Sequence, residues 1–160
     1  MDILVTAGGV DPSRELRDEA TISWLREVGA SAEYVTSVCT GALLLAEAGL
    51  LDGYKATTHW AYTQHLASYP EVELAEGRVV TDRNRITGGG VTAGLDFGLA
   101  VVAQIVGPEL AAALQLLAQL PIEGTPFGDP ATSPPELVAG VRAQSEALSP
   151  GLTEFFAAKA

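Results

Sequence analysis

Two consecutive stretches of the chain each follow the pattern of a buried strand and then an amphipathic helix. Residues 2–7 form a nearly continuous apolar run that ends at a Gly-Gly pair, as expected of a strand buried on both faces. An Asp-Pro pair then supplies a cap and a first-turn proline for a helix with apolar positions over residues 16–28. Residues 34–38 and 40–48 repeat this order, and Gly49 closes the second helix. Two βα units in tandem predict parallel strands in one sheet.

The middle of the chain predicts shorter elements. Residues 55–58 indicate a further short strand, and residues 60–68 indicate a brief helix. The polar turn at 82–84 is expected to join strands at 78–81 and 85–87 as an antiparallel hairpin.

The last third of the chain is predominantly helical. Residues 92–106 are apolar nearly all round, which predicts a central helix that ends at Gly107. Further helices are expected at 109–120, 136–147 and 152–159, with a structured loop at 121–135.

Composition bounds the fold class and excludes several functions. Apolar residues make up 48% of the 160 positions and charged residues 18%, which indicates one well-packed domain over residues 1–160, either α/β or helical. The net charge of −11 and the lack of a basic cluster argue against a nucleic-acid partner. No apolar run reaches the roughly 18 residues that cross a bilayer, and the acidic start does not match a secretion signal. We therefore expect a cytoplasmic protein with no membrane partner.

The chain has one cysteine and two histidines, a set that allows no internal disulfide and predicts no metal site. Cys39 lies where the strand 34–38 stops and a helix begins, an arrangement that resembles a nucleophile elbow. The positive end of that helix is expected to favour the thiolate and lower the thiol pKa, and Gly41 leaves room for a ligand. The alternative is a packed structural cysteine, because free cysteine is among the most buried residue types.

Three segments of the chain resemble one known family. They read TSVCTG at 36–41, AGLLDGYKATTHW at 48–60 and RITGGGVTAGLDF at 85–97. On these motifs the chain is identified as a member of the ThiJ/PfpI superfamily, the DJ-1-like and class I glutamine amidotransferase-like proteins. Within it the chain most resembles the isocyanide hydratase branch. The resemblance runs from Met1 to about Ala147 and implies a three-layer flavodoxin-like sandwich with a mostly parallel sheet.

The resemblance implies that Cys39 is the catalytic nucleophile and that the backbone N–H groups of Gly9 and Thr40 form an anion-stabilising pocket. Gly8 and Gly9 also end a strand at the carboxyl edge of the expected sheet, where α/β proteins place their sites. A tight turn alone is the other interpretation of this glycine pair.

Several side chains near these motifs are further candidates. His59 is expected to end a strand beside the cysteine strand, with either an electrostatic or positioning role or a structural one. His65 is expected at the surface, and Trp60 and Phe97 in the core or the pocket wall. Thr92 is expected to serve a helix cap, with a ligand contact as the alternative. The candidate substrate-binding residues are Gly8, Gly41, Trp60 and Thr92.

Members of the family carry a further strand, helix and strand of about 60 residues before the segment that resembles this chain. That portion includes the carboxylate that acts as general acid or base beside the cysteine, and no acid of this chain takes its position. The domain is therefore expected to be N-terminally incomplete and its catalytic cycle impaired. The strand at 3–5 would present an unpaired edge, which predicts a homodimer.

The resemblance implies a cofactor-free lyase that hydrates an isocyanide, a small electrophile, to an N-formamide through Cys39. Two alternatives stay open. One is a non-enzymatic thiol, redox or small-molecule sensor, since similar Cys-Thr-Gly and Thr-Thr-His-Trp segments occur in the sensing domains of AraC-type regulators. The other is the glyoxalase, deglycase or peptidase-like activity of other ThiJ/PfpI branches.

Overall fold

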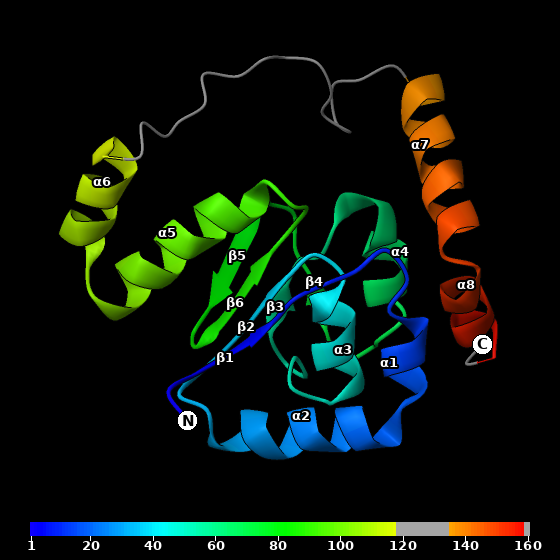
Figure 1. Cartoon of the computed structure of the whole chain (residues 1–160), viewed down its shortest axis with the longest axis horizontal. Helices are drawn as coiled ribbons and strands as arrows, with labels where there is room; N and C mark the ends of the chain where they lie inside the picture. The colour runs from blue at the N-terminus through cyan, green and yellow to red at the C-terminus, as the bar shows by residue number, and fades with distance from the viewer. Residues whose placement is uncertain (118–134, 159–160) are drawn as a thin grey trace.

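The computed structural model describes residues 1–117 and 135–158. At its centre is a four-stranded sheet in the order β1-β2-β6-β5 (Figure 1). The strands are β1 (Ile3–Thr6), β2 (Tyr34–Val38), β6 (Arg85–Gly88) and β5 (Val79–Asp82). The first three are parallel, and β5 pairs antiparallel with β6 across a turn at Arg83, whose φ is +55°. The α/β class, the mostly parallel sheet and the hairpin are thus confirmed.

One face of the sheet is covered by the helices that follow β1, β2 and β3. They are α1 (Ser13–Arg17), α2 (Glu19–Ser31), α3 (Gly41–Glu47), the short 3-10 helix η1 (Trp60–Tyr62) and α4 (Thr63–Leu66). The main core lies between this layer and the sheet, where Leu4 and Val35 share a buried cluster with Leu43 and Leu45 of α3. This packing fixes the start of α3, and with it the end of β2, against the sheet.

The other face of the sheet is covered by α5 (Ala93–Ile105), which packs on β6, β5 and β2 and completes three layers. The predicted helix is present, but within α5 only Ala93 and Phe97 are buried although the helix is apolar nearly all round. The side of β1 that faces this layer is also open, since Val5 is 60% exposed. The prediction that β1 is buried on both faces was therefore wrong.

The predicted helix over 16–28 is two helices. Asp18 ends α1 and begins α2, where its carboxylate accepts a hydrogen bond from the Ala20 N–H at 3.2 Å. Gly29 does not terminate α2 but lies inside it, and a Cβ at this position would overlap the side chain of Leu50. The glycine is therefore required by helix packing and not by a turn.

The predicted strand at 55–58 is shorter than expected and lies outside the main sheet. It is β3 (Lys55–Ala56), which pairs in parallel with β4 (Glu73–Leu74) in a separate two-stranded sheet. The chain after β3 nevertheless returns to the main sheet, because the Thr57 N–H donates to Thr87 Oγ1 of β6 at 2.9 Å. The segment that follows is thereby placed at the carboxyl end of β6.

The remaining helices are α6 (Pro108–Leu117), α7 (Pro135–Leu148) and α8 (Pro150–Ala157), all close to their predicted positions. Figure 1 shows α6 and α7 on opposite sides of the molecule. α8 packs on α1, and its Leu152 is buried in the main core. The loop predicted at 121–135 lies almost entirely outside the described residues.

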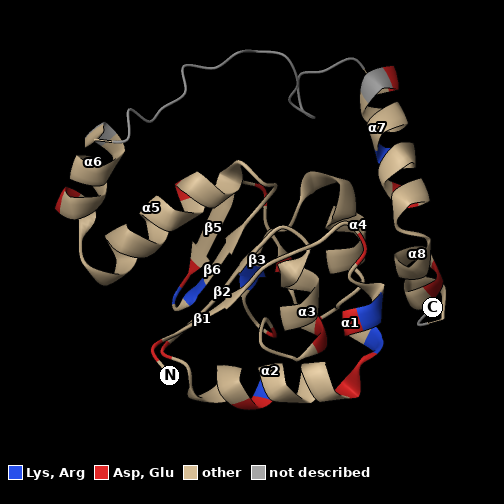
Figure 2. Ribbon diagram, in the orientation of Figure 1, with Lys and Arg blue, Asp and Glu red and all other residues tan. Residues whose placement is uncertain are grey.

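The described part of the chain contains no helix with the length and hydrophobicity needed to span a membrane. Its basic residues are scattered over α1, α2, β3, the β5–β6 hairpin with the residue before it, and α7, among more numerous acidic ones (Figure 2).

Candidate functional site

Cys39 lies at the turn between β2 and α3, as the sequence predicts, with a φ of +61°. This left-handed conformation costs a residue with a side chain about 1–3 kcal/mol, so the surroundings must hold it in place. The Cys39 N–H donates to the carbonyls of Gly88 at 2.9 Å and Gly89 at 2.8 Å. The Thr58 hydroxyl donates to the Cys39 carbonyl at 2.8 Å. Both peptide groups of the cysteine are thus fixed from the β6 side.

Two glycines allow the loop after β1 to approach this turn closely. A Cβ on Gly8 would lie 2.5 Å from the Thr40 nitrogen and 2.9 Å from the Cys39 Cβ. A Cβ on Gly41 would overlap the carbonyl of Thr6. Gly41 is therefore explained by the packing of α3 on β1, and not by the room for a ligand that the sequence suggested.

The Thr40 side chain binds the loop after β1 directly. Its Oγ1 accepts a hydrogen bond from the Gly9 N–H at 2.9 Å, and its hydroxyl donates to the Gly9 carbonyl at 2.7 Å. Since its N–H is already engaged, Gly9 does not present the free donor that the family pattern implied. The expected pocket of two converging N–H groups is therefore not formed in this structure.

A cavity of about 460 Å³ opens beside the cysteine. It draws on five parts of the chain: the loop after β1, the end of β2, the η1 region, the loop before α5, and α7. Its lining residues are Ala7, Gly8, Gly9, Val10, Val38, Cys39, His59, Tyr62, Val91, Ser145 and Leu148.

The structure brings together four of the predicted site residues, Gly8, Gly9, Cys39 and His59, around this cavity. Thr40 and Gly41 lie just behind it and are buried. The other two predicted residues lie elsewhere. Trp60 packs against the main core with the Arg142 guanidinium 5.6 Å from its ring, and Thr92 accepts a hydrogen bond from Arg78 at 3.4 Å.

Among the residues that the structure describes, the cavity lining is mostly apolar, and His59 is its one acidic or basic side chain. Three of its apolar lining residues, Val10, Val91 and Leu148, are more than half exposed. Exposed apolar groups around a concave site beside a reactive side chain are typical of a site for a small apolar ligand.

The pKa of the Cys39 thiol is raised, chiefly because burial penalises the thiolate. The Thr40 backbone N–H, next in the chain, lowers the thiol pKa but does not outweigh burial. The prediction of a lowered thiol pKa was therefore wrong. Proximity to the start of a helix could be read from the sequence, but the degree of burial could not.

The His59 imidazole is also neutral, because burial lowers its pKa. Its Nδ1 accepts a hydrogen bond from the Ala61 N–H at 3.2 Å, which leaves the ring proton on Nε2. The strand before His59 does not neighbour the cysteine strand, since β2 lies between β1 and β6. His59 reaches the cavity from the loop after β3 instead, and as a neutral ring it offers an N–H donor rather than a positive charge.

The structure also tests the predicted positions of two ring side chains, Phe97 and His65. Phe97 is buried against Gly88, as predicted. His65 was expected at the surface, which was wrong: it is 8% exposed and stacks on Phe156 of α8 with ring centroids 4.6 Å apart. The aromatic partner comes from the far end of the chain, so the local pattern around His65 did not contain it.

Sequence reasoning missed several residues of the site. Thr58 and Tyr62 hold the backbone that lines the cavity. The Thr58 hydroxyl donates to the Cys39 carbonyl at 2.8 Å, and the Tyr62 hydroxyl donates to the Val10 carbonyl at 3.0 Å. Ser145 and Leu148 of α7 form part of the wall. Only Thr58 could have been suspected, because it lies inside the ATTHW motif next to His59.

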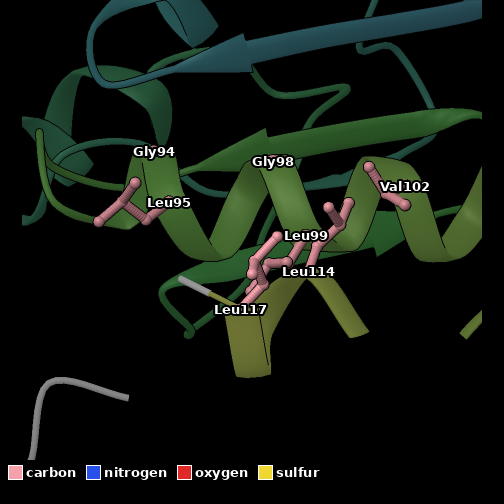
Figure 3. Close-up of a pocket in the computed structure, with 7 residues that line it drawn as sticks. All are labelled: Gly94, Leu95, Gly98, Leu99, Val102, Leu114 and Leu117. Carbon is pink, nitrogen blue, oxygen red and sulfur yellow. The ribbon is translucent and has the colours of Figure 1, made fainter. Parts of the chain in front are cut away.

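A second hollow of about 430 Å³ lies between α5 and α6, away from the cysteine (Figure 3). It is lined by Gly94, Leu95, Gly98, Leu99, Val102, Leu114 and Leu117. None of these side chains has a nucleophilic or titratable group, so this hollow offers no chemistry of its own.

Comparison with known proteins gives one family match and several close relatives. The DJ-1/PfpI family matches residues 1–104. The isonitrile hydratase of Pseudomonas putida is 42% identical over 163 residues, which cover 99% of this chain and 71% of the hydratase. The HTH-type transcriptional regulator CdhR of Pseudomonas aeruginosa is 39% identical over 111 residues, 69% of this chain and 33% of the regulator.

Solved structures show the same fold. A ThiJ/PfpI family protein from Pseudomonas syringae superposes with a TM-score of 0.86 at 38% identity. The match covers 97% of this chain but 64% of that protein. DJ-1beta of Drosophila melanogaster superposes with a TM-score of 0.65 at 20% identity over 76% of this chain and 65% of its own, which shows likeness of fold alone.

Proposed function

This chain belongs to the DJ-1/PfpI family, and we propose that it hydrates isonitriles (isocyanides) with Cys39 as its nucleophile. The observation that carries the proposal is a partly exposed cysteine, held at positive φ, on the wall of an apolar cavity. The 42% identity to the Pseudomonas putida hydratase over 99% of the chain supports it.

The proposed reaction needs only water as co-reactant. Cys39 Sγ bonds to the terminal carbon of the isocyanide, and the thiol proton is transferred to the same carbon, which gives a thioimidate. Water then adds to that carbon and the nitrogen takes a proton. Finally the carbon–sulfur bond breaks, the N-formamide leaves and the thiol is restored. No cofactor takes part.

Thr40 and His59 are proposed to assist Cys39. The Thr40 N–H, directly after the cysteine, lowers the thiol pKa and is proposed to stabilise the thiolate when it forms. Neutral His59 is proposed to direct its Nε2–H toward the substrate nitrogen or the attacking water. Gly9 is proposed to form the wall rather than to donate, because its N–H is bonded to Thr40.

The proposed enzyme is slow. Among the described residues that line the cavity there is no Asp or Glu to serve as general acid or base. Positioned proton transfer typically contributes a factor of about 10²–10⁴ in rate, and that contribution is missing from this set of residues.

The cavity lining also suggests which isocyanides bind. Its described residues offer valine and leucine side chains and no cation, so we propose substrates with an uncharged apolar substituent. An isocyanide that carries a carboxylate would lose hydration on entry and gain no partner in return.

The deciding experiment is incubation with tert-butyl isocyanide in ¹⁸O-water, followed by mass spectrometry of the product. We expect the N-formamide with one ¹⁸O from the wild-type chain, none above background from Cys39→Ser, and much less from isocyanoacetate. Equal product from wild type and Cys39→Ser would contradict the role of the cysteine.

A small-molecule sensor is the second candidate. It is favoured by the likeness to the regulator CdhR, by the raised thiol pKa and by the lack of an acid among the described residues of the cavity wall. In this case an isocyanide would raise the melting temperature of the chain while no N-formamide formed. Product formation at many turnovers per chain would exclude a purely sensing role.

We also propose a homodimer. β1 is an edge strand, and its exposed residues Ile3 and Val5 lie on the same face of the sheet as α5. The apolar hollow between α5 and α6 extends this exposed apolar surface. Light scattering should show a dimer for wild type and a monomer for Val5→Lys. Trp24→Lys, which alters an exposed side chain of α2 in the opposite layer, should remain a dimer. A monomeric wild type at micromolar concentration would contradict the proposal.

Finally, we propose that residues 1–160 fold as one domain and act in the cytoplasm. Leu152 of α8 and Leu4 of β1 share one buried cluster, which supports a single cooperative unit. A reducing compartment would keep the lone thiol free. Two separate unfolding transitions, or recovery of the protein from the secreted fraction, would contradict these two proposals.

A further inference from the structure

Thr58 connects the two reactive side chains of the site. It lies directly before His59, it is 2% exposed, and its hydroxyl donates to the Cys39 carbonyl at 2.8 Å. We propose that Thr58 is a positioning residue, which holds Cys39 in its left-handed conformation and fixes His59 in relation to the sulfur. The predicted effect of Thr58 on turnover rests on the proposed hydratase function. Its predicted effect on the reactivity of the thiol is independent of that function.

The Cys39 carbonyl depends on Thr58 for its short hydrogen bond. The other donor to this carbonyl is the Ala42 N–H at 3.4 Å, which is long for an N–H···O bond. On the other side of the residue, the Cys39 N–H has two acceptors within 2.9 Å, in Gly88 and Gly89. Loss of the Thr58 hydroxyl therefore releases the carbonyl side of the strained residue while its N–H side stays fixed.

Thr58 is itself anchored to the strand end that holds the Cys39 N–H. The Thr57 N–H donates to Thr87 Oγ1 at 2.9 Å, next to Gly88 in β6. A Cβ on Gly89 would lie 3.6 Å from the Thr58 carbonyl, so these two backbones are in contact. Both contacts that hold Cys39 thus come from one assembly at the end of β6.

The same assembly places His59. Its ring packs over Gly90, where a Cβ would lie 3.0 Å from the His59 Cδ2, while its Nδ1 is held by the Ala61 N–H. One residue before it, the Thr58 side chain points to Cys39. A shift of the 57–59 segment would therefore move the imidazole and the sulfur together. Displacements of about 1 Å in reacting groups are enough to cause large losses of rate.

The test uses the single cysteine of the chain, which makes alkylation by iodoacetamide a one-site reaction. Thr58→Val removes the hydroxyl at nearly constant volume, and Thr58→Ser keeps it. Thr36→Val is the matched control, because Thr36 is fully buried on β2 and its hydroxyl also donates to a backbone carbonyl, that of Leu4 at 2.9 Å. We expect alkylation about tenfold slower or more in Thr58→Val, and within about threefold of wild type in Thr58→Ser and Thr36→Val.

The pH profile of alkylation separates positioning from general destabilisation. In Thr58→Val the inflection should move to higher pH, because the sulfur leaves the Thr40 N–H; His59 and Tyr62 are the other titratable groups that line the cavity. If the wild type turns over isocyanide, kcat should fall in Thr58→Val while KM changes little. If the wild type shows no turnover, the alkylation rates still test the positioning role of Thr58. Failure of the hydratase proposal and failure of this one are therefore distinguishable.

Wild-type alkylation rates in folded Thr58→Val, or an equal slowing in Thr36→Val, would overturn the assignment. Should Thr58→Val fail to fold, Thr58→Ala replaces it, since it also removes the hydroxyl and introduces no new bulk. Circular dichroism confirms that each variant is folded at the temperature of the assay.

Discussion

The Thr40 hydroxyl and the Gly9 main chain exchange two hydrogen bonds, one accepted from the Gly9 N–H at 2.9 Å and one donated to its carbonyl at 2.7 Å. One side chain thereby fastens the loop after β1 to the start of α3. The wall of the cavity on that side is fixed by this pair and by the bond from the Tyr62 hydroxyl to the Val10 carbonyl.

We expect Thr40→Val to lower the free energy of unfolding by about 1–2 kcal/mol, because two hydrogen bonds to Gly9 are lost while the exposed Gly9 backbone can still bond to water. Thr40→Ser keeps the hydroxyl and should cost about 1 kcal/mol or less. Urea unfolding of the three proteins measures these differences. Equal stability of Thr40→Val and wild type would show that the Gly9 groups find other partners.

Gly41 and Gly9 should differ sharply in their tolerance of a methyl group. We expect Gly41→Ala to destabilise the chain by about 3 kcal/mol or more, since its Cβ would overlap the Thr6 carbonyl on the adjacent strand. Gly9→Ala should change stability by less than about 1 kcal/mol, because no atom lies within 4 Å of that Cβ. Thermal unfolding compares the two, and similar melting temperatures would contradict the packing explanation for Gly41.

The rate of Cys39 alkylation should still be rising at about pH 9. The raised pKa means that the thiol stays protonated over the neutral range, and only the thiolate reacts. Iodoacetamide labelling measured from about pH 6 to 10 tests this. A plateau already reached near neutral pH would mean that the helix start and Thr40 outweigh burial after all.

Acid should destabilise the protein partly through His65. Burial lowers the pKa of His65, with a smaller opposing effect from Glu146. A lowered folded-state pKa favours the neutral ring, so its contribution is present above the unfolded value of about 6.5 and is lost as the pH falls below it. We expect His65→Phe, which preserves the stacking on Phe156, to lose less stability than wild type between about pH 7 and 5. Parallel pH curves for both proteins would contradict this role.

The sequence predicted those parts of the fold that depend on local patterns. Strand β2 has its predicted bounds of 34–38, and the hairpin is centred on Arg83 as the polar turn indicated. The position of Cys39 between strand and helix was also predicted. These features follow from apolar periodicity and turn residues, and both signals involve residues that are close together in the sequence.

What the sequence did not predict depends on contacts between distant segments. Whether Val5 is covered depends on where α5 lies, and the pKa of Cys39 depends on how much of its surroundings is apolar. The partner of the Gly9 N–H is 31 residues away. The resemblance to a family supplied the candidate residues, but only the packed chain shows that Trp60 and Thr92 are not among the residues that line the cavity.

Leu148 places a helix from the far end of the chain at the rim of the cavity, beside residues of the first strand loop. A molecule held there touches the sheet and α7 at once, so part of its binding free energy restrains that helix. Amide hydrogen exchange in α7 should therefore slow when the cavity is filled, although α7 contributes nothing that reacts. The C-terminal helices would report occupancy directly, whether or not the bound molecule is ever converted.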